Sequence, residues 1–204
     1  MPINIPDEIV SLDARAVRAS MDLVARATAA DMSSPTPCAG WTLRDLLAHM
    51  SVQHYGFAAA AQGHADLAYW QPRPLGPDPV TAYRAAAEHV LATFSAGEIL
   101  DRALILPEIT RGPAFPARVA ISFHFIDYVV HSWDVAKALG LPLSFDEDLL
   151  AVALPVAEAV PGGGARLAPG AAFAPKVTWS GSAPLDRIVA VLGRSPDWKP
   201  PVGA

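Results

Sequence analysis

The sequence has little cysteine and little charge. Cys38 is the only cysteine among 204 residues, which excludes an internal disulfide framework and a cysteine-rich zinc site. Charged side chains make up 17% of the chain, against roughly 25% in an average soluble domain. Because 52% of the residues are hydrophobic, a disordered, self-repelling chain is excluded as well. We therefore expect one compact domain with a sizeable core.

The sequence also lacks basic runs and long apolar runs. Lysine and arginine together number 15 and the acidic residues 20, a net charge of −5, so nucleic acid is not an expected partner. No stretch of about 18 uninterrupted apolar residues is present, and we expect no membrane span. The N-terminus has no basic-then-apolar pattern of a secretory signal. These features predict a cytoplasmic protein.

Proline and glycine are abundant but unevenly distributed. The 20 prolines and 14 glycines concentrate at residues 35–40, 72–79, 107–116, 155–170 and 193–203. The segments between them are rich in alanine and leucine, and proline at the boundaries of good helix formers is typical of a helix bundle. Four long helices are predicted, over about residues 7–32, 42–62, 78–94 and 116–139. We expect a mainly α protein, with a four-helix bundle over residues 1–142.

Several helix ends carry recognisable capping residues. Thr42 followed three residues later by Asp45 predicts the start of the second helix. Asp78 and Pro79 are typical of the N-cap and first helical position of the third. Gly140 is the expected C-cap of the fourth.

The last part of the chain, residues 143–204, is predicted to be a small α/β extension packed on the bundle. A shorter helix is expected over residues 145–160 and a last one over 183–192. The alternation of apolar residues over 173–179 predicts a short strand between them.

The fourth predicted helix carries an unusual polar stripe. At 3.6 residues per turn, its four ionisable residues lie within roughly a quarter of the helix circumference; they are His124, Asp127, His131 and Asp134. The rest of its surface is apolar, so we expect protein on all sides and an internal cavity facing the stripe. Buried carboxylates and imidazoles are costly unless they are paired or bind a metal.

A metal site is one explanation of this stripe. Asp127 and His131, four residues apart, can both reach one cation, and a further ligand must come from elsewhere. His49, on the inward face of the second helix, is the best donor. Asp127 and His131 alone are equally well explained as a buried hydrogen-bonded pair that fixes the helix register. The two further ionisable residues on the stripe favour the metal site.

The roles of the other members of the stripe stay open. His124 is a ligand, a group behind the ligands, or an acid/base at the cavity mouth, and the last two are favoured. Asp134 orients His131 or caps a neighbouring helix. The three remaining histidines, His54, His64 and His89, are assigned no role.

Three segments resemble one known family. Residues 37–49 (PCAGWTLRDLLAH) resemble the entry to the second helix in the mycothiol-dependent maleylpyruvate isomerase-like proteins, a branch of the DinB-like, metal-binding four-helix superfamily. Residues 127–136 (DYVVHSWDVA) resemble the fourth-helix signature of these proteins. Residues 192–198 (LGRSPDW) are similar to the C-terminal end of many actinobacterial members. The resemblance covers nearly the whole chain, and its motifs are more specific for fold and metal site than for reaction.

The resemblance implies a ligand set and cofactors. His49, Asp127 and His131 match the metal ligands of the family, with Asp127 where the isomerase has the longer glutamate. Two imidazoles and one carboxylate leave an open position for water or a thiolate. The implied metal is divalent, zinc in the first place and nickel in the second, and mycothiol is the implied thiol cosubstrate.

The resemblance also suggests how a reaction would run. A divalent cation lowers the pKa of a bound thiol, and the thiolate attacks a small electrophilic substrate. His124 is then the candidate for proton transfer, and Arg84 a candidate for holding a substrate carboxylate, although a solvated surface arginine is the alternative for Arg84. Cys38 is interpreted as a small packing residue, because nothing local marks it as activated.

Three functions follow from such a site. The first is a metal-dependent thiol transferase or isomerase of the mycothiol-using type. The second is a metal hydrolase, in which hydroxide replaces the thiolate, and the third is a non-enzymatic module that binds metal and a small ligand. Whether the chain is an enzyme, and whether it forms a homodimer, are left open at this point.

Overall fold

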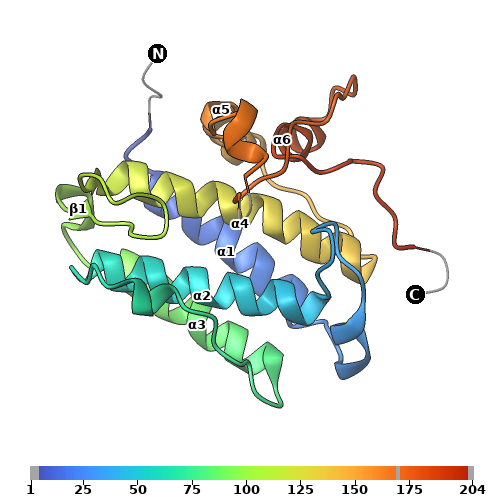
Figure 1. The fold of residues 1–204 in the computed structure, drawn as a ribbon, viewed down its shortest axis with the longest axis horizontal. Coiled ribbons are helices and arrows are strands. Elements are labelled where there is room, and N and C mark those ends of the chain that lie inside the picture. The colour runs from blue at the N-terminus through green and yellow to red at the C-terminus, as the bar shows by residue number, and fades with distance from the viewer. Residues whose placement is uncertain (1–4, 169–170, 202–204) are drawn as a thin grey trace.

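Four long helices form the body of the computed structural model, which describes residues 5–168 and 171–201. They are α1 (Ile9–Val24), α2 (Leu43–Ala61), α3 (Pro79–Phe94) and α4 (Ala117–Leu139). The chain packs α1 along α4 and α2 along α3 (Figure 1). The predicted mainly helical fold class is confirmed. None of the helices in the described ranges combines the length and the apolar character that a membrane crossing requires.

The predicted helix caps are present. The Thr42 hydroxyl accepts a hydrogen bond from the backbone N–H of Asp45, whose carboxylate in turn accepts from the Thr42 backbone N–H at 2.9 Å. This reciprocal pair satisfies two backbone donors at the start of α2. Asp78 caps α3 through the backbone N–H of Thr81 at 3.0 Å. Gly140 ends α4 in the left-handed conformation, which glycine adopts without steric cost.

The prediction of one helix over residues 7–32 is wrong at its C-terminal end. The helix α1 ends at Val24, and a separate 3₁₀ turn, η1, covers Ala29–Ser33. Thr28 is extended, and its backbone N–H and hydroxyl both donate to the Asp31 carboxylate at 2.7 Å. This local capping arrangement offers the backbone an alternative to continuing α1.

The connection between α3 and α4 carries the two strands. After η3 (Ile99–Asp101), β1 (Ala103–Leu104) pairs antiparallel with β2 (Phe115–Pro116). The hairpin lies at one end of the bundle (Figure 1). The long loop between the two strands therefore starts and ends beside α2 and α4, both of which contact β1.

The C-terminal segment forms a further layer on α4. It contains α5 (Glu147–Ala159), η4 (Gly163–Arg166) and α6 (Pro184–Val191). These elements lie on the side of α4 that faces away from α2 and α3 (Figure 1). Arg15 of α1 binds the carboxylates of Asp146 and Asp148 at the start of α5, at 2.5 and 2.6 Å. The boundary between bundle and extension at residue 142 stays a prediction.

The predicted strand over residues 173–179 is wrong. The segment is extended but joins no sheet, and the backbone N–H of Val177 donates to the carbonyl of Ala190 beside α6. Phe173 is buried, at 9% exposure. Alternating apolar residues indicate that one face of an extended segment is buried. Here that face packs against helices, and the segment pairs with no strand. Within the described ranges, β1 and β2 are the only strands.

The helix α4 is enclosed by the rest of the protein, as its composition predicts. Between Ala120 and Ala136 every residue is buried except Phe123 and Asp127. The polar stripe of α4 thus lies inside the protein, where each charged group requires a partner. The partial exposure of Asp127 marks the place where the stripe reaches solvent.

Replacement of Gly56 by alanine tests the packing of α2. A Cβ at this position would overlap the ring of buried Trp70. Alanine favours a helix by about 1 kcal/mol over glycine, but overpacking costs about 1–3 kcal/mol. We expect Gly56→Ala to lower the free energy of unfolding, measured by urea denaturation. Gly97→Ala is the control, since its Cβ would meet nothing within 4 Å; equal stability of the two variants would contradict the packing argument.

Candidate metal centre

Three predicted ligands come together between α2 and α4. His49, Asp127 and His131 each offer one ligand atom, and these atoms all lie within 4.8 Å of one another. His131 Nε2 lies 3.3 Å from Asp127 Oδ1, and the imidazole rings of His49 and His131 have centroids 5.2 Å apart. The Asp127 side chain keeps 17% exposure, so the cluster is within reach of solvent. That the cluster binds a metal stays a prediction.

The opposite side of the His131 ring is held by a buried ion pair. His131 Nδ1 donates to Asp134 Oδ2 at 2.9 Å, and the same oxygen accepts from Arg194 Nη2 at 3.1 Å. Asp134 is fully buried and Arg194 is 7% exposed. Because Nδ1 is hydrogen-bonded to Asp134, Nε2 is directed toward the ligand cluster, where it can bind a cation once it loses its proton. Asp134 therefore orients His131, one of its two predicted roles.

A second group of ligand atoms shares His131. Cys38, His131 and Asp134 also lie within 4.8 Å of one another. Arg194 Nη2, however, is 3.1 Å from Asp134 and 3.4 Å from Cys38 Sγ. The guanidinium already supplies positive charge there and would repel a metal ion, which favours the His49 group. Cys38, predicted to be a packing residue, instead makes polar contacts, including a 3.3 Å hydrogen bond to Asp134.

The charges of the cluster are strongly coupled. Burial, together with the charge of His131, lowers the pKa of His49 to about 4. Burial alone would raise the pKa of Asp127, but the charge and hydrogen bond of His131 outweigh it and hold that pKa at about 2. Burial would lower the pKa of His131, yet the charge of Asp127 and the hydrogen bonds around the ring raise it. In the metal-free cluster a proton on His131 balances the Asp127 charge, and a cation must displace it.

His124 lies in a different cluster. Its Nδ1 donates to Asp13 at 2.6 Å, and its Nε2 shares a 3.1 Å hydrogen bond with His54. His54 continues to the Tyr83 hydroxyl at 3.4 Å, which bonds Ser20 at 2.5 Å. All five side chains are buried, and they join α1, α2, α3 and α4.

The predicted position of His124 at a cavity mouth is therefore wrong. The side chain has no solvent exposure, and both ring nitrogens are already hydrogen-bonded. Helical periodicity places His124 and Asp127 on one stripe of α4. It does not reveal that the turn with His124 and the turn with Asp127 face different neighbouring side chains. The catalytic role of His124 stays a prediction without support from this geometry.

Arg84 and the two remaining histidines lie apart from the cluster. Arg84 is exposed on α3, beside a hollow of about 190 Å³ between α1 and α3. None of the three proposed ligands lines this hollow. His64 and His89, which were assigned no role, are exposed and lie against the rings of Tyr69 and Tyr55. A role for Arg84 in holding a cosubstrate or substrate stays a prediction.

Three residues to which the sequence analysis assigned no role lie near the cluster. The Trp41 ring is 37% exposed and 5.0 Å from the His49 ring. Gln53, one helical turn after His49, donates from Nε2 to Glu108 Oε2 at 2.8 Å. The spacing of Gln53 and His49 places both on the inward face of the second helix, since residues four apart share a helix face, but it does not reveal the partner of Gln53. Nothing in the sequence marked Glu108, which reaches α2 from the loop between β1 and β2.

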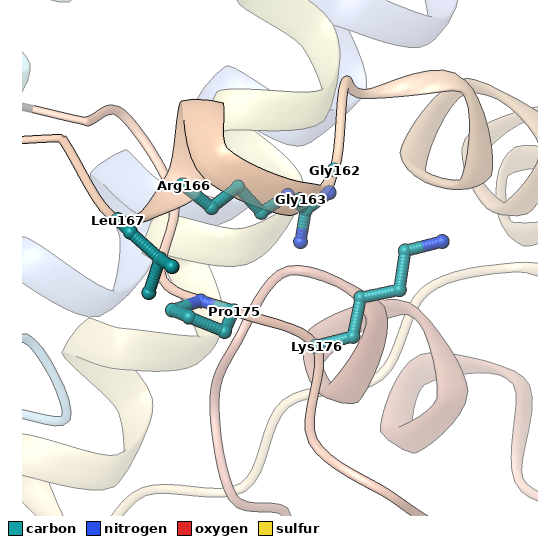
Figure 2. Close-up of a pocket in the computed structure, with 6 residues that line it drawn as sticks. All are labelled: Gly162, Gly163, Arg166, Leu167, Pro175 and Lys176. Carbon is teal, nitrogen blue, oxygen red and sulfur yellow. The ribbon is translucent and has the colours of Figure 1, made fainter.

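A larger hollow of about 310 Å³ lies in the C-terminal segment. It is lined by Gly162, Gly163, Arg166, Leu167, Pro175 and Lys176 (Figure 2). The guanidinium of Arg166 donates to four backbone carbonyls, those of Val160, Pro161, Ala174 and Val191. Arg166 therefore holds η4, α5 and α6 together, and it is not free to bind an anion. Since no carboxylate or imidazole lines this hollow, the cluster of His49, Asp127 and His131 is the better candidate site.

Removing one ligand tests the cluster directly. We expect His131→Ala to abolish stoichiometric metal, because one carboxylate and one imidazole remain. His89→Ala should retain full occupancy, as its side chain is exposed on α3. Inductively coupled plasma mass spectrometry of both purified variants measures the metal content. Full occupancy in His131→Ala would refute the ligand assignment.

The ion pair behind His131 is tested by substitution of Arg194. Partners that orient a metal-bound histidine typically contribute about 10- to 100-fold to metal affinity, so we expect a loss of that size in Arg194→Ala. A zinc competition titration with a chromophoric chelator measures it, after circular dichroism has shown the variant to be folded. Arg187→Ala, exposed on α6 and 3.8 Å from Glu158, is the control. Unchanged affinity in Arg194→Ala would show that Asp134 orients His131 without help.

Comparisons with known proteins agree with this fold. The family model described as the mycothiol maleylpyruvate isomerase N-terminal domain matches residues 14–136. Two uncharacterized proteins, from two strains of Mycobacterium tuberculosis, are each 30% identical over 189 residues, covering 89% of this chain and 94% of theirs. A crystal structure of the mycothiol-dependent maleylpyruvate isomerase has a TM-score of 0.55 at 17% identity, over 78% of this chain and 71% of that one. A histidine-to-alanine mutant of that enzyme gives the same TM-score at 16% identity. The chain belongs to the mycothiol maleylpyruvate isomerase family.

Proposed function

We propose that this protein binds a divalent metal ion through His49, Asp127 and His131 and uses a small thiol, mycothiol, to modify a small electrophilic substrate. The reaction class is thiol transfer, or isomerisation through reversible thiol addition. The observation that carries the proposal is the cluster itself, in which two imidazoles and one carboxylate converge within 4.8 Å. Membership of a family named for a mycothiol-dependent isomerase supports the choice of thiol.

The residues present fit a zinc ion better than a harder cation. Zinc is typically bound by nitrogen and carboxylate donors, and catalytic zinc sites use three protein ligands with one open position. Magnesium and calcium prefer oxygen ligands alone. The hydrogen bond from His131 to Asp134 is the kind of outer contact that fixes a ligating imidazole. Nickel is the second choice, since imidazole and carboxylate ligands also suit it.

When bound by His49, Asp127 and His131, a divalent metal would lower the pKa of a thiol at its open position. The protein side chains do the rest. His131 is held in one tautomer by Asp134, so that a ligand nitrogen always faces the cluster. Trp41 offers a partly exposed apolar surface beside His49, against which the carbon skeleton of a bound molecule can pack.

The remaining sequence-based predictions concern the cellular location and the partners of the protein. A cytoplasmic location is consistent with the use of a small-molecule thiol. The absence of nucleic acid partners and the formation of a homodimer stay predictions. Neither affects the ligand cluster, whose three residues belong to one chain.

Thiol binding to the zinc-loaded protein tests the proposed function. We expect mycothiol to bind at least about tenfold more tightly than 2-mercaptoethanol, a difference of about 1.4 kcal/mol, because a larger thiol makes additional contacts. Isothermal titration calorimetry measures both affinities, and the metal-free protein is the control.

Other outcomes separate the alternatives. Ester hydrolysis by the zinc-loaded protein without any preference for mycothiol would favour a metal hydrolase. Zinc binding with neither thiol preference nor hydrolysis would favour a binding module. Purified protein that holds no metal, and takes up none when zinc is supplied, would refute all three functions.

A further inference from the structure

The loop between β1 and β2 brings a carboxylate to α2, next to a side chain that lies one turn from His49. Glu108 Oε2 accepts a hydrogen bond of 2.8 Å from Gln53 Nε2. Gln53 is buried, at 7% exposure, and follows His49 by one turn of α2. The two side chains leave the same face of the helix. Gln53 therefore anchors Glu108 one turn away from a proposed metal ligand.

Glu108 also lies within the electrostatic field of the cluster. Burial of its carboxyl group raises the pKa of Glu108, and the hydrogen bond from Gln53 acts in the opposite direction. The Asp127 carboxylate raises this pKa further only while no cation neutralises its charge. The residue as a whole remains exposed. A carboxylate of this kind combines an increased proton affinity with direct exchange with water.

The other acids and bases near α4 are already engaged. Asp134 is paired with Arg194 at 3.1 Å, and Asp13 with His124 at 2.6 Å. Both pairs are buried, so neither carboxylate can meet an incoming molecule. Asp45, one turn before His49, is engaged by Thr42 at the start of α2. Glu108 is neither a proposed ligand nor part of the ion pairs found among the described residues.

We propose that Glu108 accepts the proton of the thiol that enters the open position beside His49, Asp127 and His131, and that Gln53 is its positioning residue. The proposal rests on the metal site of the proposed function, but not on mycothiol being the thiol. It replaces His124 as the proton-transfer group, because Glu108 is exposed whereas His124 is enclosed.

The proton transfer balances without any further reactant. The S–H bond of the thiol breaks, its electron pair stays on sulfur, and an O–H bond forms on the Glu108 carboxylate. After addition of the sulfur to an electrophile, the same proton can pass from Glu108 to the product. No oxidant or reductant is required, and the charge of the site is unchanged by the transfer.

Proton counting by calorimetry tests this role. Zinc-loaded protein is titrated with 2-mercaptoethanol at about pH 7, in two buffers that differ in ionisation enthalpy, which gives the protons released to buffer per thiol bound. In wild type we expect less than one proton per thiol to reach the buffer, because Glu108 retains part of it. In Glu108→Gln we expect release to rise toward one proton per thiol and the affinity for thiol to fall by about tenfold.

Two controls keep the result specific. Glu108→Gln preserves the shape and the possibility of a hydrogen bond to Gln53, so a merely structural role would leave proton release unchanged. Glu88→Gln removes an exposed carboxylate of α3 and should behave as wild type. Zinc content, measured in parallel, should be equal in all three proteins.

The outcomes distinguish this proposal from the proposed function. Equal proton release in wild type and Glu108→Gln, at equal zinc content, overturns the role of Glu108. A clear Glu108 effect without preference for mycothiol supports Glu108 and contradicts the choice of cosubstrate. Zinc-loaded protein that binds no thiol overturns both.

Discussion

The buried contact between Asp134 and Arg194 is the interaction on which the candidate site depends. Arg194 follows α6, and Asp134 belongs to α4, so the 3.1 Å contact joins the C-terminal layer to the bundle. Asp134 also holds His131 at 2.9 Å. Two charges taken out of water are costly, and loss of one partner leaves the other unbalanced. The C-terminal segment thus contributes to the geometry of a cluster whose ligands all lie in α2 and α4.

The polar stripe of α4 serves two separate purposes. Toward its start, His124 joins Asp13 and His54 in a chain of hydrogen bonds that continues to Tyr83 and so contacts all four helices of the bundle. One turn later, Asp127 and His131 face His49 and reach solvent. In the first cluster both ring nitrogens of His124 are hydrogen-bonded, and the side chains are closed to solvent. The second leaves ligand atoms directed at one another, which is the arrangement a cation can stabilise.

The sequence predicted the features that depend on local spacing. Caps such as Thr42 with Asp45 involve residues three apart, and Asp127 with His131 involve one helix face, so both follow from helical geometry alone. The approach of His49 to Asp127 and His131 depends on how α2 packs against α4. The position of His49 on the inward face of α2 nevertheless predicted it. The resemblance to one family added the choice of metal and thiol.

Features that depend on which elements meet were missed or misplaced. The sequence did not reveal that Asp13 approaches His124, or that Glu108 reaches Gln53 from a loop, because both contacts join residues far apart in the chain. The apolar alternation near Phe173 predicts a strand, whereas an extended segment packed on helices produces the same pattern. Local periodicity identifies buried faces, but it does not identify their partners.

X-ray absorption spectroscopy of the zinc-loaded protein, without added thiol, tests the central claim most directly. The cluster of His49, Asp127 and His131 predicts nitrogen and oxygen neighbours at about 2.0–2.2 Å, with the multiple-scattering signal of two imidazoles and no sulfur. A sulfur neighbour at about 2.3 Å would instead indicate Cys38 as a ligand. That result, or a spectrum with no imidazole contribution, would contradict the assignment of the metal centre.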